Sequence, residues 1–412
     1  MIYSRLPLIL LFLLSLFIVQ ISAGNMDLYL LNQLKYPDQM CLDGSTSGFY
    51  LQQGYGDGKN KWIIFFEGGG ACFGPDKKTS LQTCVPRLYM GQGSSKYWSN
   101  EKEPRGILQD NKETNPQFYN WNKVFIPYCD GMVHQGYTKK PARYLTWTFR
   151  FRGLYNTQAV FQELVDNYGL SDSSVTDVLL GGSSAGGYAV FTYADYVHSL
   201  LNQNTKFWAF ADSGLFINFH EEVQDNFMVK CFKSMLELID KEYVLPLGCD
   251  LINNDDENWK CVLPVNVAKQ VKSDLFIIES QYDLFNLIVF DGVLCIKHAS
   301  LQYCDNDVQK MVQEFRLSMI SNINEVVYNK HNANAWSISC VKHGFTAGNS
   351  YYNSGIYRIP QHVGYSPQEA LYEWMYASDS QRQNYIDQRQ WPFNAPCNGV
   401  TDEALGVDEV YQ

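Results

Sequence analysis

The stretch from residue 175 to residue 201 most constrains what this chain can fold into, because it joins three local patterns without a break. Residues 175–180 form a short apolar run that is typical of a buried strand. Gly182-Ser183-Ser184-Ala185-Gly186 follows and fits the pattern Gly-x-Ser-x-Gly. Residues 187–201 then have the spacing of a helix. Since glycine tolerates a strained turn that larger residues do not, the segment predicts a strand, a sharp turn and a helix in succession.

Short apolar runs alternate with helical segments along much of the chain. This alternation predicts an α/β fold, with a mostly parallel central sheet flanked by helices on both faces. Residues 216–265 and 291–303 fit the pattern less well and are rich in cysteine, so we interpret them as disulfide-tied insertions. The expected strands are 62–66, 124–128, 175–180, 207–210, 274–279 and 335–341, and the expected helices are 155–168, 187–201 and 308–323.

One of the two adjacent serines in the turn is a candidate nucleophile. Ser184 occupies the central position of Gly-x-Ser-x-Gly, the pattern in which a sharp turn lifts a serine hydroxyl above the sheet. The N–H of Ala185 would then lie at a helix N-terminus, where it can face a developing oxyanion. The alternative is a tight turn whose serine has no chemical role. We favour Ser184 as the nucleophile.

A further oxyanion donor is expected from a glycine-rich loop after an early strand. Gly68-Gly69-Gly70-Ala71 follows the apolar run 62–66 directly. Consecutive glycines let backbone N–H groups turn toward one point, so Gly69 and Gly70 are the expected donors. The alternative is a flexible surface turn.

A nucleophilic serine also needs an imidazole base and a carboxylate that fixes the tautomer of that base. His343 directly follows the strand-like run 335–341 and precedes a glycine, which places it on a loop at a strand end. Asp283 follows the run 274–279 and leaves room for a helix before the histidine. Asp212 ends another strand, so it is the competing acid or a residue that lines the site. Asp274 begins a strand and would lie at the wrong edge of the sheet. We prefer Asp283 and His343.

The N-terminus and the cysteines indicate a secreted protein. Arg5 precedes an apolar run at 6–19, and small residues follow at 22–24. This pattern predicts a signal peptide over residues 1–23, with a single membrane anchor as the alternative. No later stretch is apolar enough to span a membrane, so we expect no stable span after the signal is removed. Eleven cysteines fit an oxidising compartment, and their odd number leaves at least one free or paired with another chain.

The net charge of −11 argues against nucleic acid as a partner and against an anionic membrane surface as the main one.

From residue 41 to residue 343, the chain resembles the pectin acetylesterase and Notum family of carboxylesterases. The matching motifs stand in order along the sequence, which makes them far more specific than the serine turn alone. They are Cys41-Leu42-Asp43-Gly44-Ser45, Trp62 to Gly70 with Cys72, Gly93 to Tyr97, Asn115-Pro116, Trp121-Asn122, Tyr128 to Gly131, Arg152-Gly153, Gly182 to Gly187, Ala211 to Phe216, Asp283 and His343.

This resemblance implies an α/β-hydrolase-type fold and ester hydrolysis by a Ser-Asp-His triad, without a metal or a cofactor. It carries the nucleophile to Ser184, the acid to Asp283 and the base to His343. It also implies an oxyanion hole formed by Gly69, Gly70 and Ala185. Residues 24–412 would form a single esterase domain. The resemblance further implies two disulfides, one between Cys72 and Cys84 and one between Cys41 and Cys129.

Two departures from the family pattern concern the substrate. The family usually has a tryptophan in the glycine loop, where this chain has Gly70 and Ala71. His134 stands where plant members have small residues, so it is a candidate pocket residue together with Ala71 and Asp212. We expect an acylated substrate, most simply an acetylated polysaccharide. The alternatives are a Notum-like lipid or protein deacylase, which needs a deep apolar pocket, and a catalytically inactive binding protein of the same fold.

Overall fold

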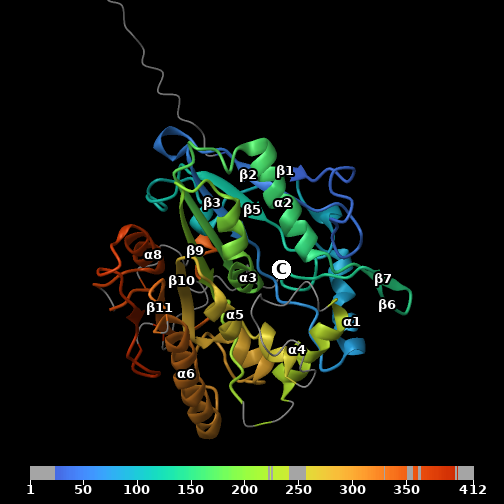
Figure 1. Ribbon diagram of the computed structural model, residues 1–412. Helices are drawn as coiled ribbons and strands as arrows, with labels where there is room; N and C mark the ends of the chain where they lie inside the picture. Colours follow the sequence, from blue (N-terminus) through green and yellow to red (C-terminus); the bar gives the residue numbers. More distant parts are fainter. Residues whose placement is uncertain are drawn as a thin grey trace, which may run out of the picture.

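The computed structural model describes residues 24–220, 223, 226–240, 257–328, 330–349, 356–360, 363–394 and 397. The predicted signal peptide therefore lies outside the described residues. A ten-stranded sheet runs through the molecule in the order β12-β11-β10-β9-β8-β3-β5-β2-β1-β4 (Figure 1). The seven strands from β12 to β5 are parallel, and antiparallel pairing from β5 through β2 and β1 to β4 completes the sheet.

The central strands follow the apolar runs of the sequence, and the edge strands do not. They are β1 Met26–Leu30, β2 Gly48–Gln52, β3 Lys61–Phe66, β4 Glu101–Lys102, β5 Asn122–Ile126, β8 Asp177–Ser183, β9 Lys206–Asp212, β10 Leu275–Asp283, β11 Ala333–Lys342 and β12 Tyr385–Ile386. Every residue of β5, β8, β10 and β11 is buried. Strands buried on both faces are expected in a parallel sheet that helices cover on each side.

Successive side chains of a strand point to opposite faces of the sheet, and the core is accordingly divided into two clusters, one on each face. In β3, Trp62, Ile64 and Phe66 belong to the larger cluster, whereas Ile63 and Phe65 belong to the smaller one. The larger cluster contains residues of α2 (Gly153–Tyr168), α3 (Ala185–Leu200), α4 (Phe227–Leu238), α5 (Pro264–Gln270) and α6 (Asn306–Val327). The smaller cluster contains residues of α8 (Pro367–Tyr376), which covers the opposite face. The parallel sheet covered on both faces is therefore confirmed.

Four disulfides join described cysteines. Cys41–Cys129 and Cys72–Cys84 are the two that the resemblance implied. Cys295–Cys304 joins the predicted insertion 291–303 to the residue that follows it, and Cys340–Cys397 joins β11 to the C-terminal part of the chain. Cys261 is also disulfide-bonded. Cys231, in α4, is the free cysteine among the described residues, and burial raises the pKa of its thiol to about 12.

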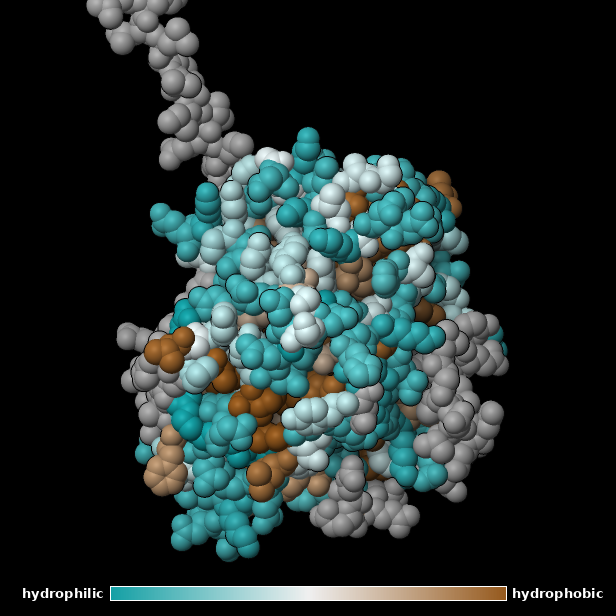
Figure 2. Space-filling model, turned by 60° about the vertical axis from the view of Figure 1, so that its left-hand side comes forward, coloured by the Kyte–Doolittle hydropathy of each residue, from teal (hydrophilic) through white to brown (hydrophobic). Residues whose placement is uncertain are grey.

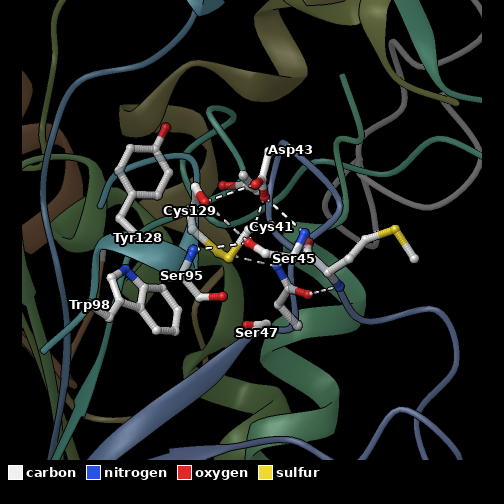
Figure 3. Close-up of a disulfide and its surroundings, with 12 residues drawn as sticks. Cys41, Asp43, Ser45, Ser47, Ser95, Trp98, Tyr128 and Cys129 are labelled. Carbon is white, nitrogen blue, oxygen red and sulfur yellow. Dashed lines mark hydrogen bonds between the residues drawn. A yellow bond between two sulfur atoms is a disulfide. The ribbon is translucent and has the colours of Figure 1, made fainter. Parts of the chain in front are cut away.

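The Cys41–Cys129 disulfide lies beside a turn that the sequence marked as Cys-Leu-Asp-Gly-Ser (Figure 3). One oxygen of the Asp43 carboxylate, Oδ1, accepts hydrogen bonds from the amide and the hydroxyl of Ser45. The other oxygen, Oδ2, accepts from Oγ of Ser94 and from Nζ of Lys96, at 2.8 Å each. These bonds fasten the turn near the carboxyl end of β5, where Cys129 follows the strand.

The surface is mainly hydrophilic on the face shown in Figure 2, where hydrophobic side chains gather in one area of the lower half. No helix in the described part of the chain combines the length and the apolar character needed to cross a membrane.

Candidate active site

Ser184 lies at the sharp turn between β8 and α3, where the chain reverses direction. Its φ is 58° and its ψ is −121°, which is rare for a residue other than glycine. The flanking glycines permit this turn because the chain passes too closely for side chains. A Cβ on Gly182 would lie 2.3 Å from the carbonyl oxygen of Gly186, and a Cβ on Gly186 would lie 2.1 Å from that of Phe66.

Ser184, His343 and Asp283 form one continuous hydrogen-bonded row, although they are far apart in the sequence. Oγ of Ser184 lies 2.8 Å from Nε2 of His343, and Nδ1 of His343 lies 2.6 Å from Oδ2 of Asp283. The other oxygen of Asp283 accepts the amide of Asn286 at 2.8 Å. A carboxylate beside Nδ1 keeps the proton on that nitrogen, so Nε2 is free to accept the serine proton. The parallel sheet creates this meeting because β8, β10 and β11 all end at the same edge.

Asp212, the competing acid, holds the histidine loop in place and makes no hydrogen bond to the imidazole. Its carboxylate is fully buried, and Oδ2 accepts the amides of Phe345 and Thr346 at 2.8 Å each and the Thr346 hydroxyl at 2.7 Å. Its backbone carbonyl accepts the amide of Ser184 at 2.8 Å. Asp212 therefore fixes both the serine turn and the loop after His343 through a buried carboxylate.

Two further charged groups lie buried behind the triad, and neither was singled out from the sequence. Glu279 accepts hydrogen bonds from the amides of Leu215 and Ser280, at 3.1 Å each. Burial, together with the nearby carboxylate of Asp283, raises the pKa of the Glu279 carboxyl well above its usual value. Burial lowers the pKa of Lys342 to about 8, against the attraction of the neighbouring carboxylates. The available signal was one carboxylate inside the apolar run Phe276-Ile277-Ile278-Glu279.

The glycine loop passes directly beside the nucleophile. A Cβ on Gly68 would lie 2.6 Å from the carbonyl oxygen of Ser183 and 3.0 Å from Cβ of Ser184. Gly69 and Gly70 have φ values of 145° and 63°, which glycine adopts without strain. Two segments therefore border Ser184, the glycine loop and the start of α3. The N–H groups of Gly69 and Gly70 belong to the first, and that of Ala185, the first residue of α3, belongs to the second.

Arg87 and His134 each form a hydrogen bond to the backbone of the glycine loop or of the residue before it. Nη2 of Arg87 donates to the carbonyl oxygen of Gly69 at 2.7 Å. Nε2 of His134 lies 2.8 Å from the carbonyl oxygen of Glu67. His134 is only 4% exposed, and burial lowers its pKa to about 4. His134 is therefore a neutral donor beneath the loop, and its imidazole is bonded to the backbone of that loop. Arg87 was not predicted, since an arginine in a loop carries no sequence signal of its own.

Aromatic side chains surround the imidazole on the side of the glycine loop. The ring of Phe285 stacks on His343 with centroids 5.3 Å apart, and Phe216 stacks at 6.2 Å. A Cβ on Gly70 would lie 3.8 Å from the Phe285 ring, and Phe290 packs against both phenylalanines. Phenylalanines from other parts of the chain therefore form an aromatic surface beside the glycine loop, where the family usually has a tryptophan.

Comparisons with known proteins show the family of this chain. The sequence profile of the pectinacetylesterase family matches residues 19–398. The chain belongs to the pectinacetylesterase family. It is 29% identical over 311 residues to pectin acetylesterase 4 of Arabidopsis thaliana, covering 74% of this chain and 73% of that protein. It is 31% identical over 258 residues to the palmitoleoyl-protein carboxylesterase NOTUM of Mus musculus, covering 60% of this chain and 49% of that protein.

A solved structure shows the same fold as this family member. The Wnt deacylase Notum from Drosophila superposes with a TM-score of 0.73 at 23% sequence identity, covering 89% of this chain and 98% of that one. The α/β-hydrolase-type fold predicted from the sequence is therefore confirmed. Since the relatives are pectin acetylesterases and Notum carboxylesterases, the protein is a carboxylic ester hydrolase.

Proposed function

We propose that this pectinacetylesterase-family member is a secreted serine esterase that removes acetyl groups from a polysaccharide. The observation that carries the proposal is the row of hydrogen bonds from Ser184 through His343 to Asp283. The expected signal peptide and the disulfides support secretion. The names of the Arabidopsis relatives support an acetylated polysaccharide as the substrate class.

The reaction proceeds in two steps at Ser184. Nε2 of His343 takes the serine proton while Oγ attacks the ester carbonyl, and Asp283 stabilises the imidazolium that forms. The carbonyl oxygen becomes negative against the N–H groups of Gly69, Gly70 and Ala185. The alcohol leaves with the proton from His343. Water then attacks the acyl-enzyme, gives its proton to His343, and releases the acid and the serine.

A longer acyl group is the second candidate, because Phe216, Phe285 and Phe290 pack together beside His343. Apolar walls next to the nucleophile are what an acyl chain requires. The NOTUM relatives are named for the removal of such a group from proteins. This candidate differs from the first in the acyl group and the alcohol, while the chemistry at Ser184 is the same.

Hydrolysis of p-nitrophenyl acetate, butyrate, octanoate and decanoate by the mature protein tests both candidates. A rate that falls steeply beyond acetate supports a deacetylase, and a rate that rises toward octanoate supports a lipid or protein deacylase. Ser184→Ala is the control and should lose nearly all activity. Equal rates for the wild type and this variant would exclude Ser184 as the nucleophile.

A further inference from the structure

The hairpin formed by β6 (Ala142–Tyr144) and β7 (Trp147–Phe149) belongs to the most basic segment of an acidic chain. Residues 131–162 contain five Lys or Arg and no Asp or Glu, although acidic residues number 43 among the 412 of the chain. Lys140 and Arg143 are exposed and form no ion pair within the described residues. Arg152 pairs with Asp38, so the local positive charge of the hairpin comes from Lys140, just before β6, and Arg143, on a protein whose net charge is −11.

Aromatic rings stand beside these cations. Tyr144 and Trp147 stack with ring centroids 6.2 Å apart and an interplanar angle of 13°. Nε1 of Trp147 donates to the hydroxyl of Tyr89 at 3.1 Å, and Tyr89 is 61% exposed. Rings of this kind combine a flat apolar face with a polar edge, which suits the alternating apolar and hydroxylated surfaces of a sugar.

The base of the hairpin is fastened while its tip projects. The amide of Arg150 donates to the carbonyl oxygen of Leu42 at 2.9 Å, and the amide of Thr138 donates to that of Phe151 at 3.0 Å. Figure 1 shows β6 and β7 extending away from the body of the molecule beyond α1 (Lys77–Cys84). Tyr144 and Trp147 are partly buried against the larger core cluster, whereas Arg143 is exposed. The rings are thus anchored in a defined position and keep only part of their surface accessible.

The same hairpin is connected to the catalytic centre through one short turn. Tyr89, which contacts Trp147, ends the 3₁₀ turn Pro86–Tyr89. Arg87, in the same turn, donates to the carbonyl oxygen of Gly69 in the glycine loop. A polymer lying along the hairpin would therefore lie on the side of the molecule where the glycine loop borders Ser184.

We propose that the β6–β7 hairpin binds an acidic polysaccharide, a polymer of sugars that bear carboxylates, and holds it beside the catalytic serine. The inference rests on the proposed function in taking this polymer as the substrate of Ser184. Lys140 and Arg143 pair with the carboxylates, and the rings of Tyr144 and Trp147 face the sugars. An anionic membrane is a poorer match, because Leu145 is the one aliphatic side chain in the 142–149 hairpin that is largely exposed, which is too little apolar surface for insertion.

Equilibrium binding to polygalacturonate at low ionic strength tests the proposal with the Ser184→Ala protein, which binds without turnover. The test variant adds Lys140→Glu and Arg143→Glu. The matched control adds Lys59→Glu and Lys206→Glu, two exposed lysines at the amino ends of β3 and β9, on the edge of the sheet opposite Ser184. Both double variants change the net charge from −11 to −15, since each substitution changes it by −2.

We expect the hairpin variant to bind polygalacturonate about tenfold more weakly, while the control binds as Ser184→Ala does. Added salt should weaken binding, and neutral dextran should not bind. If both double variants lost the same affinity for polygalacturonate, net charge alone would explain the loss and the proposal would be overturned. Unchanged affinity in the hairpin variant would overturn it as well. Tighter binding to phosphatidylserine vesicles, abolished by Leu145→Asp, would assign the hairpin to a membrane instead.

The measurement separates this inference from the proposed esterase activity. Binding of polygalacturonate that depends on Lys140 and Arg143, in a protein that hydrolyses no ester, would retain the hairpin site and refute the esterase. Hydrolysis of p-nitrophenyl acetate without any hairpin-dependent binding would do the reverse. With both present, the KM for acetylated polygalacturonate should rise in the otherwise wild-type hairpin variant, with a smaller change in kcat.

Discussion

Asp283 and Asp212 both lie at strand ends, but we expect their replacement by asparagine to have opposite effects. Asp283→Asn should mainly lower kcat, and Asp212→Asn should mainly lower stability. In Asp283, Oδ1 accepts the amide of Asn286 and Oδ2 faces Nδ1 of His343. An asparagine here keeps its carbonyl oxygen on the Asn286 amide, which turns its NH₂ group toward His343. The imidazole must then accept at Nδ1 and carry its proton on Nε2, where it cannot take the proton of Ser184. We expect kcat to fall by ~10⁴-fold in Asp283→Asn, with little change in Tm.

In Asp212, Oδ2 accepts three hydrogen bonds from Phe345 and Thr346, and none comes from the imidazole. An asparagine oxygen can accept the same three, but without the negative charge that strengthens them. A charged partner adds about 1 kcal/mol to a hydrogen bond, so Asp212→Asn should lose about 2–3 kcal/mol of stability. In a chain of this size that corresponds to a fall in Tm of roughly 3 °C. Its kcat should fall by less than ~10²-fold, because the tautomer of His343 is unchanged.

Steady-state kinetics on p-nitrophenyl acetate and thermal unfolding of both variants check this contrast. The reasoning is refuted if Asp212→Asn is inactive with an unchanged Tm. It is equally refuted if Asp283→Asn keeps a rate within ~10-fold of the wild type.

Three further predictions concern the surroundings of the site. His134 stays neutral in the folded protein, so the unfolded chain binds a proton at this histidine first as the pH falls below 6.5. Urea titrations should therefore show the free energy of unfolding decreasing by up to ~3 kcal/mol toward pH 4. His134→Gln, whose amide can still donate to the Glu67 carbonyl oxygen, should reduce that decrease. Gly186→Ala forces a Cβ to within 2.1 Å of a backbone carbonyl oxygen and should lower Tm and secreted yield, whereas Gly91→Ala, whose nearest contact is 3.4 Å, should not. Burial raises the pKa of Asp291 to about 6, so ionisation at pH 7 opposes folding; Asp291→Asn should therefore raise Tm at pH 7, and this gain should vanish near pH 4.

The central strands and helices could be predicted because burial on both faces leaves continuous apolar runs. The expected helix at 155–168 is α2 (Gly153–Tyr168), and the strand at 335–341 is β11 (Ala333–Lys342). The antiparallel strands β1 and β2 and the hairpin β6–β7 were not predicted. β1, β6 and β7 are partly exposed, and pairing between distant segments, as between Leu28 and Tyr50, leaves no periodic signal in either one.

The residues of the candidate site were recoverable where chemistry fixes both the residue type and its place at a strand end. Ser184, His343 and Asp283 meet both conditions. Arg87 and Phe285 meet neither, because they act through contacts that only the folded chain creates. Asp212 met both conditions as well as Asp283 did, and only the hydrogen-bond partners separate their positions.

Asp212 forms hydrogen bonds both to the turn that holds the nucleophile and to the loop that follows the base. Its carbonyl oxygen accepts the amide of Ser184, and its carboxylate accepts the amides of the loop after His343, which lies 159 residues after Ser184 in the chain. The spacing between serine and imidazole is thus set locally, at the end of β9, and does not depend on the length of the chain between β9 and β10. Ser213, Leu215 and Phe216 also contact this site, so we expect a different choice of substrate to come from variation further along the insertion, while the reactive atoms keep their distances.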